Sequence, residues 1–182
     1  MSADSGASRP LLLIDVDGPL NPYAAKASRR PAGYETHRMR PSGWTGLHVK
    51  PLRVWLNPEH GPALTALPFE LVWCTTWMAE ANDWIGPHLG LPVLDHVPFD
   101  DVRLPSRKDG TYFKTWEVVR WARGRPFAWV DDEIGDPDRE YVSDVHPGPA
   151  LLLTVSPRLG LLPTDFEQLA EWASSLDKAV TP

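Results

Sequence analysis

The stretch Leu11-Leu-Leu-Ile-Asp15-Val-Asp17-Gly18 decides the fold, because it joins a short apolar run to two carboxylates and a glycine. Four consecutive aliphatic residues are typical of a strand that is buried on both faces, as in a parallel sheet. Asp15 and Asp17 are two residues apart at the end of this run, so their side chains point to the same side. Gly18 permits a sharp turn away from the strand. The stretch therefore predicts a buried strand that ends in a functional loop.

Three further fragments carry polar groups at the end of an apolar run or at the start of a helical pattern. The run Leu71-Val-Trp-Cys-Thr75 ends in a hydroxyl, with Thr76 as the neighbouring alternative, and Trp129-Val-Asp131-Asp132 ends in a second pair of carboxylates. Lys114 stands where a helical pattern begins, and Lys108 is the rival lysine. Two carboxylate pairs, a hydroxyl and an ammonium are the groups needed to hold Mg²⁺ and a phosphate and to attack phosphorus.

The first carboxylate pair does not belong to an EF-hand calcium loop. Such a loop needs glycine at its sixth position and glutamate at its twelfth, and counting from Asp15 these positions hold Leu20 and Lys26. Carboxylates this close repel each other unless a cation neutralises them. The residues therefore favour a Mg²⁺ site built from Asp15, Asp17, Asp131 and Asp132.

Apolar runs alternate with helical patterns along the chain of 182 residues. Five runs have the length of buried parallel strands: 10–16, 69–74, 92–97, 126–131 and 150–155. Four segments have helical patterns with start or stop signals: 59–67, 77–89, 115–123 and 163–176, the last with the spacing of a capping box at Thr164 and Glu167. This alternation predicts an α/β protein with a three-layer, Rossmann-like, doubly wound and mainly parallel five-stranded sheet. Ligands of such sheets bind beyond the carboxyl ends of the strands, where the residues named above fall.

The segment 21–57 interrupts this alternation and is predicted to be a small flap, for example a β-hairpin, inserted after the first strand. It is too short to form a cored cap domain, so we expect an open site. Between Lys26 and Arg53 there are seven Lys or Arg and one acid, Glu35; this net +6 leaves −12 for the rest of a chain that totals −6. Two interpretations stay open, a solvated loop or an electropositive flap that attracts a polyanion.

The bulk composition is that of an ordinary globular protein, with 42% hydrophobic and 23% charged residues. Residues 1–9 are predicted to be a disordered tail and residues 10–182 a single domain. No apolar stretch is long enough to cross a bilayer, and the amino terminus lacks the features of a signal peptide. The one cysteine, Cys74, excludes an intrachain disulfide and suits a reducing compartment. We expect a cytoplasmic protein without a membrane partner, and we expect Cys74 to be a buried strand residue.

The order of the motifs resembles that of the haloacid dehalogenase (HAD) superfamily of phosphatases and phosphotransferases. In that family a strand ending in Asp-x-Asp-Gly precedes a strand ending in Thr or Ser, then a Lys, then a strand ending in an acidic pair. The matching residues here are Asp15-Val-Asp17-Gly18, Thr75, Lys114 and Asp131-Asp132. The segments 17–22, 73–77 and 125–133 also resemble the HAD domain of Swiss Army Knife RNA repair-like proteins. The likeness covers residues 11–155, nearly the whole of the predicted domain.

The resemblance implies a role for each of these residues. Asp15 is the nucleophile that forms an aspartyl-phosphate, and Asp17 is first the general acid for the leaving oxygen and then the base that activates water. Thr75 hydrogen-bonds a phosphoryl oxygen, while Lys114 neutralises the nucleophile and the phosphate. Mg²⁺ is held by Asp15, by the backbone carbonyl of Asp17 and by one of the pair Asp131 and Asp132.

The expected function is that of a Mg²⁺-dependent phosphatase with an open site. Terminal phosphates of RNA or DNA are one candidate substrate; the alternatives are a nucleotide or sugar phosphate, or a non-catalytic module that binds phosphorylated partners. Most of the nine tryptophans are interpreted as core or helix-packing residues, and Trp44 and Trp77 are alternatively candidates to stack on a base or a sugar. Asp136 is a candidate to support the metal ligands. The remaining acids after the fourth motif are interpreted as a solvated loop: Glu133, Asp138, Glu140 and Asp144.

Overall fold

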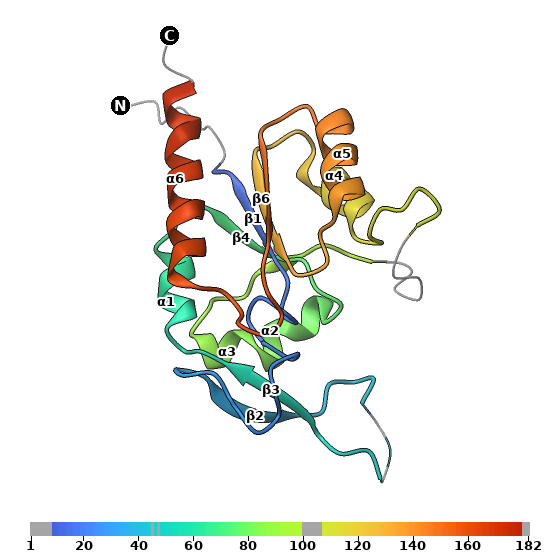
Figure 1. The fold of residues 1–182 in the computed structure, drawn as a ribbon, viewed down its shortest axis with the longest axis vertical. Coiled ribbons are helices and arrows are strands. Elements are labelled where there is room, and N and C mark those ends of the chain that lie inside the picture. Colours follow the sequence, from blue (N-terminus) through green and yellow to red (C-terminus); the bar gives the residue numbers. More distant parts are fainter. Residues whose placement is uncertain (1–8, 45, 47, 100–106, 180–182) are drawn as a thin grey trace.

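The computed structural model describes residues 9–44, 46, 48–99 and 107–179. The tail predicted for residues 1–9 therefore lies, apart from Arg9, outside the described residues. The chain forms a five-stranded, all-parallel sheet in the order β5-β4-β1-β6-β7, with helices on both faces (Figure 1). This confirms the predicted three-layer, Rossmann-like α/β fold. The strands are β1 (Leu11–Ile14), β4 (Glu70–Trp73), β5 (Asp95–His96), β6 (Phe127–Asp131) and β7 (Ala150–Thr154).

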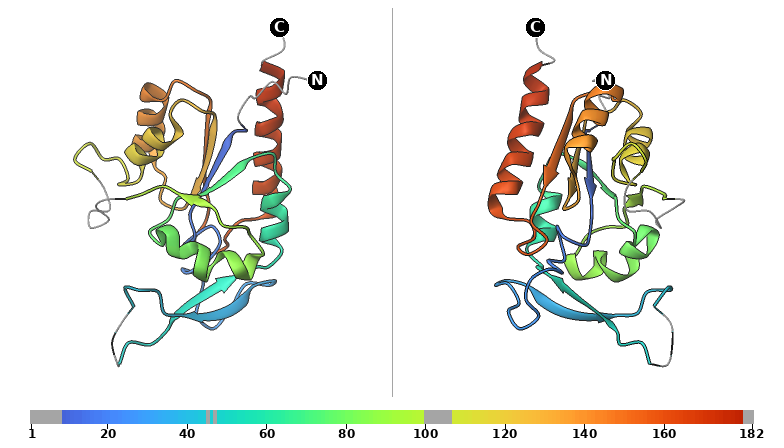
Figure 2. Two further views of the ribbon diagram at one scale, coloured as in Figure 1. Left: turned by 180° about the vertical axis from the view of Figure 1, so that it is seen from behind. Right: turned by 45° about the vertical axis from the view of Figure 1, so that its right-hand side comes forward.

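The side chains of β1 divide between two hydrophobic cores, which is why all four of its residues are buried. Leu12 and Ile14 belong to one core, and Leu11 and Leu13 belong to the other. Figure 2 shows the helices on either side of the sheet. The first core is covered by α1 (His60–Thr65), α2 (Ala81–Trp84), α3 (Gly86–Leu89) and α6 (Pro163–Ala179), and the second by α4 (Thr115–Ala122) and α5 (Asp136–Val145).

Two predicted segments differ from the structure. The segment 77–89 is not one helix but a 3-10 turn (Met78–Glu80) followed by α2 and α3. Met78 has a positive φ of 46°, which a continuous helix does not allow, and Pro87 cannot donate a backbone hydrogen bond. The acidic segment after β6, interpreted above as a solvated loop, forms the helix α5.

The carboxy-terminal helix α6 begins at Pro163, as predicted. Its first turn is capped differently from the predicted Thr164–Glu167 box, because Asp165 Oδ2 accepts a hydrogen bond from the Leu162 N–H at 2.7 Å. Within the described ranges, no helix combines the length and the apolar character that a membrane span requires.

The flap contains a β-hairpin of β2 (Glu35–Met39) and β3 (Leu52–Leu56), which pair antiparallel. In Figure 1 this hairpin lies beyond the carboxyl ends of β1 and β6. Its apolar residues Met39, Val54 and Leu56 are buried in the first core. The flap is therefore anchored to the main body of the protein, close to the predicted site.

The sheet brings the predicted motifs to one crevice. From β1 the chain moves outward to β4 and β5, and it then returns to the other side of β1 as β6 and β7. Ile14 lies level with both Trp73 and Val130, so the residues directly after them emerge side by side. The reversal between β1 and β6 opens a crevice at their carboxyl ends, which is where ligands of such sheets bind.

Candidate active site

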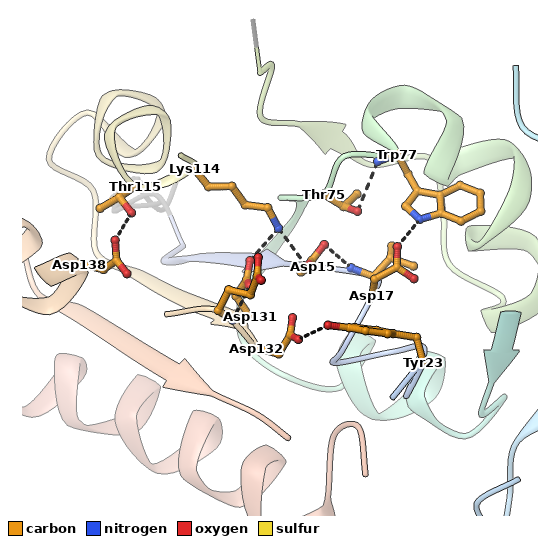
Figure 3. A network of polar contacts seen from close by, with 12 residues as sticks. Asp15, Asp17, Tyr23, Thr75, Trp77, Lys114, Thr115, Asp131, Asp132 and Asp138 are labelled. Atoms are coloured by element: carbon orange, nitrogen blue, oxygen red, sulfur yellow. Dashed lines mark hydrogen bonds and ion pairs between the residues drawn. The ribbon is translucent and has the colours of Figure 1, made fainter. Parts of the chain in front are cut away.

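Lys114 lies between two aspartates at the carboxyl ends of neighbouring strands (Figure 3). Its Nζ is 2.9 Å from Asp15 Oδ2 and 2.7 Å from Asp131 Oδ2. Lys114 is only 1% exposed and Asp131 0% exposed, whereas the rival Lys108 is exposed. The structure thus brings Lys114, and not Lys108, together with the first and fourth motifs.

The two carboxylates that pair with Lys114 form a cluster with a third, that of Asp132. Oxygens of Asp15, Asp131 and Asp132 all lie within 4.8 Å of one another. Burial raises the pKa of Asp15 to about 8 against the opposing charge of Lys114, and the charge of Asp131 adds to this rise. Burial likewise raises the pKa of Asp132 to about 6. Burial alone would lower the pKa of Lys114, but Asp15 and Asp131 outweigh it and hold that pKa well above its usual range.

When all three carboxylates are ionised, the cluster carries more negative charge than the one ammonium that pairs with Asp15 and Asp131 can neutralise. Such an excess is costly in a buried site without a further cation. Carboxylate oxygens are the ligands that Mg²⁺ prefers in proteins. Asp15, Asp131 and Asp132 therefore fit a divalent cation in both charge and chemistry.

Backbone hydrogen bonds orient the two carboxylates that pair with Lys114. Asp15 Oδ1 accepts the Val16 N–H at 2.8 Å, and Asp131 Oδ1 accepts the Glu133 N–H at 3.0 Å. Each aspartate thus uses one oxygen for the backbone and the other for Lys114. This pattern fixes the direction of both side chains.

Gly18 allows the first-motif loop to approach Asp132. Its φ is +98°, and a Cβ at this position would lie 2.5 Å from both Cγ and Oδ1 of Asp132. Any other residue would be strained by this φ and would clash with a carboxylate of the cluster. The sequence predicts the turn at Gly18, and the structure adds the close approach.

Asp17 is held apart from the three-carboxylate cluster. Its Oδ1 accepts a hydrogen bond from Asn21 Nδ2 at 2.7 Å, and its Oδ2 accepts one from Trp77 Nε1 at 2.9 Å. Within the described residues, the close cluster consists of Asp15, Asp131 and Asp132, without Asp17. Asp17 instead lines a cleft beside the site. Of the four carboxylates predicted for the metal site, Asp17 is thus the one whose side chain points elsewhere, toward Trp77 in Figure 3.

Thr75 and Thr76 differ in their surroundings. Thr75 is buried, and its Oγ1 accepts a long hydrogen bond of 3.4 Å from the Trp77 N–H. Thr76 is exposed and lines the cleft next to Asp17. The neighbouring Cys74 is buried as expected, and burial raises the pKa of its thiol well above the usual range.

Three residues that contact this site or support it have no functional role predicted from the sequence. Tyr23 donates its hydroxyl proton to Asp132 Oδ2 at 3.0 Å. Asn21 binds Asp17 and also accepts the Trp55 N–H at 3.0 Å, so it links the first motif to β3 of the flap. The spacing of four residues between Asp17 and Asn21 is compatible with a hydrogen bond within one turn, so the contact of Asn21 could have been predicted. Nothing in the sequence indicates that Tyr23 contacts Asp132.

The third residue is Asp138, and its interpretation as part of a solvated loop is wrong. Asp138 is 2% exposed. Its Oδ1 accepts hydrogen bonds from the Tyr112 N–H at 2.7 Å and from the Thr115 hydroxyl, and its Oδ2 accepts the Gly135 N–H at 2.8 Å. Asp138 therefore joins the start of α5 to the turn that carries Lys114. Asp136, the candidate to support the metal ligands, is exposed in the first turn of α5 and does not join the close carboxylate cluster of the described residues.

Comparisons with protein-family models, with curated proteins and with solved structures each found no match to this chain. The side chains of the site therefore carry the available information on activity. These comprise a buried carboxylate paired with an ammonium, a set of oxygen donors suited to a divalent cation, and a further carboxylate that faces a cleft.

Proposed function

We propose that this protein is a Mg²⁺-dependent phosphomonoester hydrolase of the HAD type, which works through an aspartyl-phosphate intermediate. The observation that carries the proposal is the position of Lys114, within 2.9 Å of Asp15 and 2.7 Å of Asp131 at the switch point of the sheet. A carboxylate beside a lysine and a metal site can attack phosphorus, because both cations draw charge from the phosphoryl oxygens.

The metal would be held by Asp15, Asp131 and Asp132, whose oxygens lie within 4.8 Å of one another. When bound there, Mg²⁺ neutralises the excess carboxylate charge and withdraws charge from the phosphoryl group. Lys114 supplies a fixed positive charge next to Asp15 and Asp131.

In the first step, a carboxylate oxygen of Asp15 attacks phosphorus, and the bond from phosphorus to the leaving oxygen breaks. Asp17 donates a proton to that leaving oxygen, and its hydrogen bonds from Asn21 and Trp77 orient it toward the cleft. The Thr75 hydroxyl donates a hydrogen bond to a phosphoryl oxygen. The products of this step are the aspartyl-phosphate and the protonated leaving group.

In the second step, water attacks the phosphorus of the aspartyl-phosphate while Asp17 accepts its proton. The bond between phosphorus and the Asp15 oxygen breaks, which releases inorganic phosphate and restores the Asp15 carboxylate. Asp17 ends the cycle protonated, ready to act again as the acid.

The direct test is phosphate release from p-nitrophenyl phosphate with Mg²⁺ and with EDTA. Asp15→Asn should lower the rate on the order of 10⁴-fold or more, since it removes the nucleophile. Asp17→Asn should lower it by about 10²–10⁴-fold, which is the usual value of general acid catalysis. Asp136→Asn, an exposed aspartate outside the cluster, is the matched control and should stay within about twofold of the wild type.

Two results would contradict the proposal. One is activity that survives complete removal of divalent cations, and the other is an Asp15→Asn variant as active as the wild type. Binding of inorganic phosphate without release from any phosphomonoester would instead support a non-catalytic phosphate-binding module.

A further inference from the structure

A cleft of ≈ 740 Å³ opens between the flap and the turn after β4, with Asp17 in its wall. This volume is typical of small-molecule sites, and it is several times larger than a phosphate group requires. In the proposed mechanism Asp17 faces the leaving oxygen. The cleft therefore lies where the leaving group of the substrate must be bound.

Three aromatic side chains line this cleft: Tyr23, Trp44 and Trp77. Tyr23 is 47% and Trp44 40% exposed, although large aromatic side chains are usually covered. The Trp44 indole is oriented by a hydrogen bond from its Nε1 to the Lys50 carbonyl at 2.8 Å. Accessible and oriented aromatic faces in a cleft are suited to stacking a planar ring.

The cleft wall also holds a cationic side chain, Arg53. The guanidinium of Arg53 lies over the Trp55 ring, with 3.7 Å from Cζ to the ring centroid. Its Nη1 is buried and has no hydrogen-bond partner among the described residues. Nη1 itself is out of reach of a ligand, but Arg53 as a whole is only partly buried and lines the cleft. Its other N–H groups can therefore donate to oxygen or nitrogen acceptors of a bound ligand.

On the basis of the proposed function, we propose that this cleft binds the leaving group and that the leaving group is a nucleoside. The planar base stacks on Trp44 and Tyr23, and Arg53 donates to an acceptor of the base or of an adjoining phosphate. A simple sugar offers no planar ring, and a simple aryl group offers few acceptors for Arg53. The substrate is then a nucleotide unit with a terminal phosphate, either free or at the end of an oligonucleotide.

The test measures binding rather than turnover and uses the full chain with Asp15→Asn, which prevents hydrolysis. Titrations with adenosine 5′-monophosphate and with ribose 5-phosphate, at one Mg²⁺ concentration, give the ratio of the two affinities. The nucleotide should bind at least about tenfold more tightly, and Trp44→Ala should reduce this ratio by roughly 5- to 100-fold, the usual effect of one base–aromatic stack.

Two further variants separate stacking from damage to the fold. Trp44→Phe keeps an aromatic face and should restore most of the ratio. Trp116→Ala is the matched control, because Trp116 is 41% exposed, as Trp44 is 40% exposed, but lies outside the cleft and stacks on Tyr141. Equal affinity for the two ligands, or a ratio that Trp44→Ala leaves unchanged, would overturn the nucleoside assignment.

A phosphorylated oligonucleotide, titrated at two salt concentrations, distinguishes the two sources of the nucleotide unit. Tighter, salt-sensitive binding of the oligonucleotide supports a polymer end held by the basic flap. Equal binding of the mononucleotide supports a free nucleotide. A failure of the wild type to release phosphate from any substrate would reject the proposed function, whereas equal binding of nucleotide and sugar phosphate would reject only the nucleoside assignment.

Discussion

The Lys114 side and the Asp17 side of the site are held in different ways. On the Lys114 side, buried carboxylates from two central strands each bind the ammonium and the backbone. On the Asp17 side, the partners Asn21 and Trp77 come from turns, and the cleft beyond them is walled by exposed aromatic residues. If the proposed function is correct, the sheet fixes the groups for phosphoryl transfer, while the flap and turns select the substrate. Substitutions on the Lys114 side should then cost both stability and activity, and those on the Asp17 side mainly activity.

Lys114→Met should have the largest effect. It leaves Asp15 and Asp131 buried without their ammonium, which should reduce the free energy of unfolding by about 3–5 kcal/mol. It also removes a fixed charge next to the phosphoryl group, so phosphate release should fall roughly 10³-fold. Urea unfolding and phosphate release measure the two effects separately.

Lys108→Met is the matched control, because Lys108 is exposed and is the other lysine that the sequence allows for this role. Its activity and stability should stay near those of the wild type. If Lys108→Met lost more activity than Lys114→Met, the lysine of the site would have been assigned to the wrong position.

Asp138→Ala should have the next largest effect, although Asp138 does not touch the metal cluster. The change leaves the N–H groups of Tyr112 and Gly135 and the Thr115 hydroxyl without their acceptor. A loss of about 3–4 kcal/mol is expected from unpaired buried donors. Because Tyr112 and Thr115 flank Lys114 closely in sequence, phosphate release should fall as well.

Asp136→Ala tests this reading within the same helix. Asp136 lies two residues away in α5 but is exposed, so its removal should change stability by less than about 0.5 kcal/mol. Equal effects of the two alanine variants would show that the buried hydrogen bonds of Asp138 contribute no more to stability than the exposed Asp136 does.

Asp138 also shows where prediction from sequence ends. Asp15, Thr75 and Asp131 could be found because each ends an apolar run, and strand ends of a parallel sheet converge in space. The segment after β6 offers mainly charged residues, so nothing local reveals that Asp138 meets the Tyr112 backbone 26 positions earlier in the chain. Burial of this kind depends on tertiary packing.

The Asp17 side was less predictable than the Lys114 side for a related reason. Trp77 is a candidate core or stacking residue in the sequence, yet its indole N–H binds Asp17 across 60 positions of sequence. The positive φ of Met78 interrupts the helix predicted from Trp77 onward. Hydrogen bonds from irregular turns leave no periodic signal in a sequence, whereas buried strands do.

The attachment of the flap to the domain should weaken in acid. His60 packs between Tyr34, which precedes β2, and Phe166 of α6, with ring centroids 5.6 Å from each. Burial lowers the pKa of His60 to about 4, below the usual value of 6.5 for the unfolded chain. The stability that depends on neutral His60 is therefore complete above pH 6.5 and decreases as the pH falls toward 4, by up to about 2–3 kcal/mol.

Urea unfolding at pH 7 and at pH 4.5 measures this loss. His60→Phe keeps a ring that does not titrate, so it should unfold with a weaker pH dependence than the wild type. The same pH dependence in both proteins would show that other groups cause the acid sensitivity and that His60 contributes nothing to it.

Trp77→Phe should reduce activity more than stability, as expected for the Asp17 side. The ring is kept but the indole donor to Asp17 Oδ2 is lost, so Asp17 is less well oriented toward the leaving oxygen. We expect kcat to fall about tenfold, the equivalent of one hydrogen bond to a charged group. KM and the unfolding free energy should change little, and Trp116→Phe, which lies outside the cleft, is the control for replacing a tryptophan.

Tyr23→Phe should have the smallest effect. It is the most sensitive test of the difference between the Lys114 side and the Asp17 side, because Tyr23 contacts both. Its hydroxyl binds Asp132 at 3.0 Å, while its ring lines the cleft. Removal of an exposed hydrogen bond costs about 0.5–1 kcal/mol, so the Mg²⁺ concentration at half-maximal phosphate release should rise roughly two- to fivefold. Because the ring remains, the preference for a nucleotide over ribose 5-phosphate should persist. A loss of stability as large as that of Asp138→Ala would mean that the flap stabilises the protein as much as the Lys114 side does. The proposed difference between the Lys114 side and the Asp17 side would then be wrong.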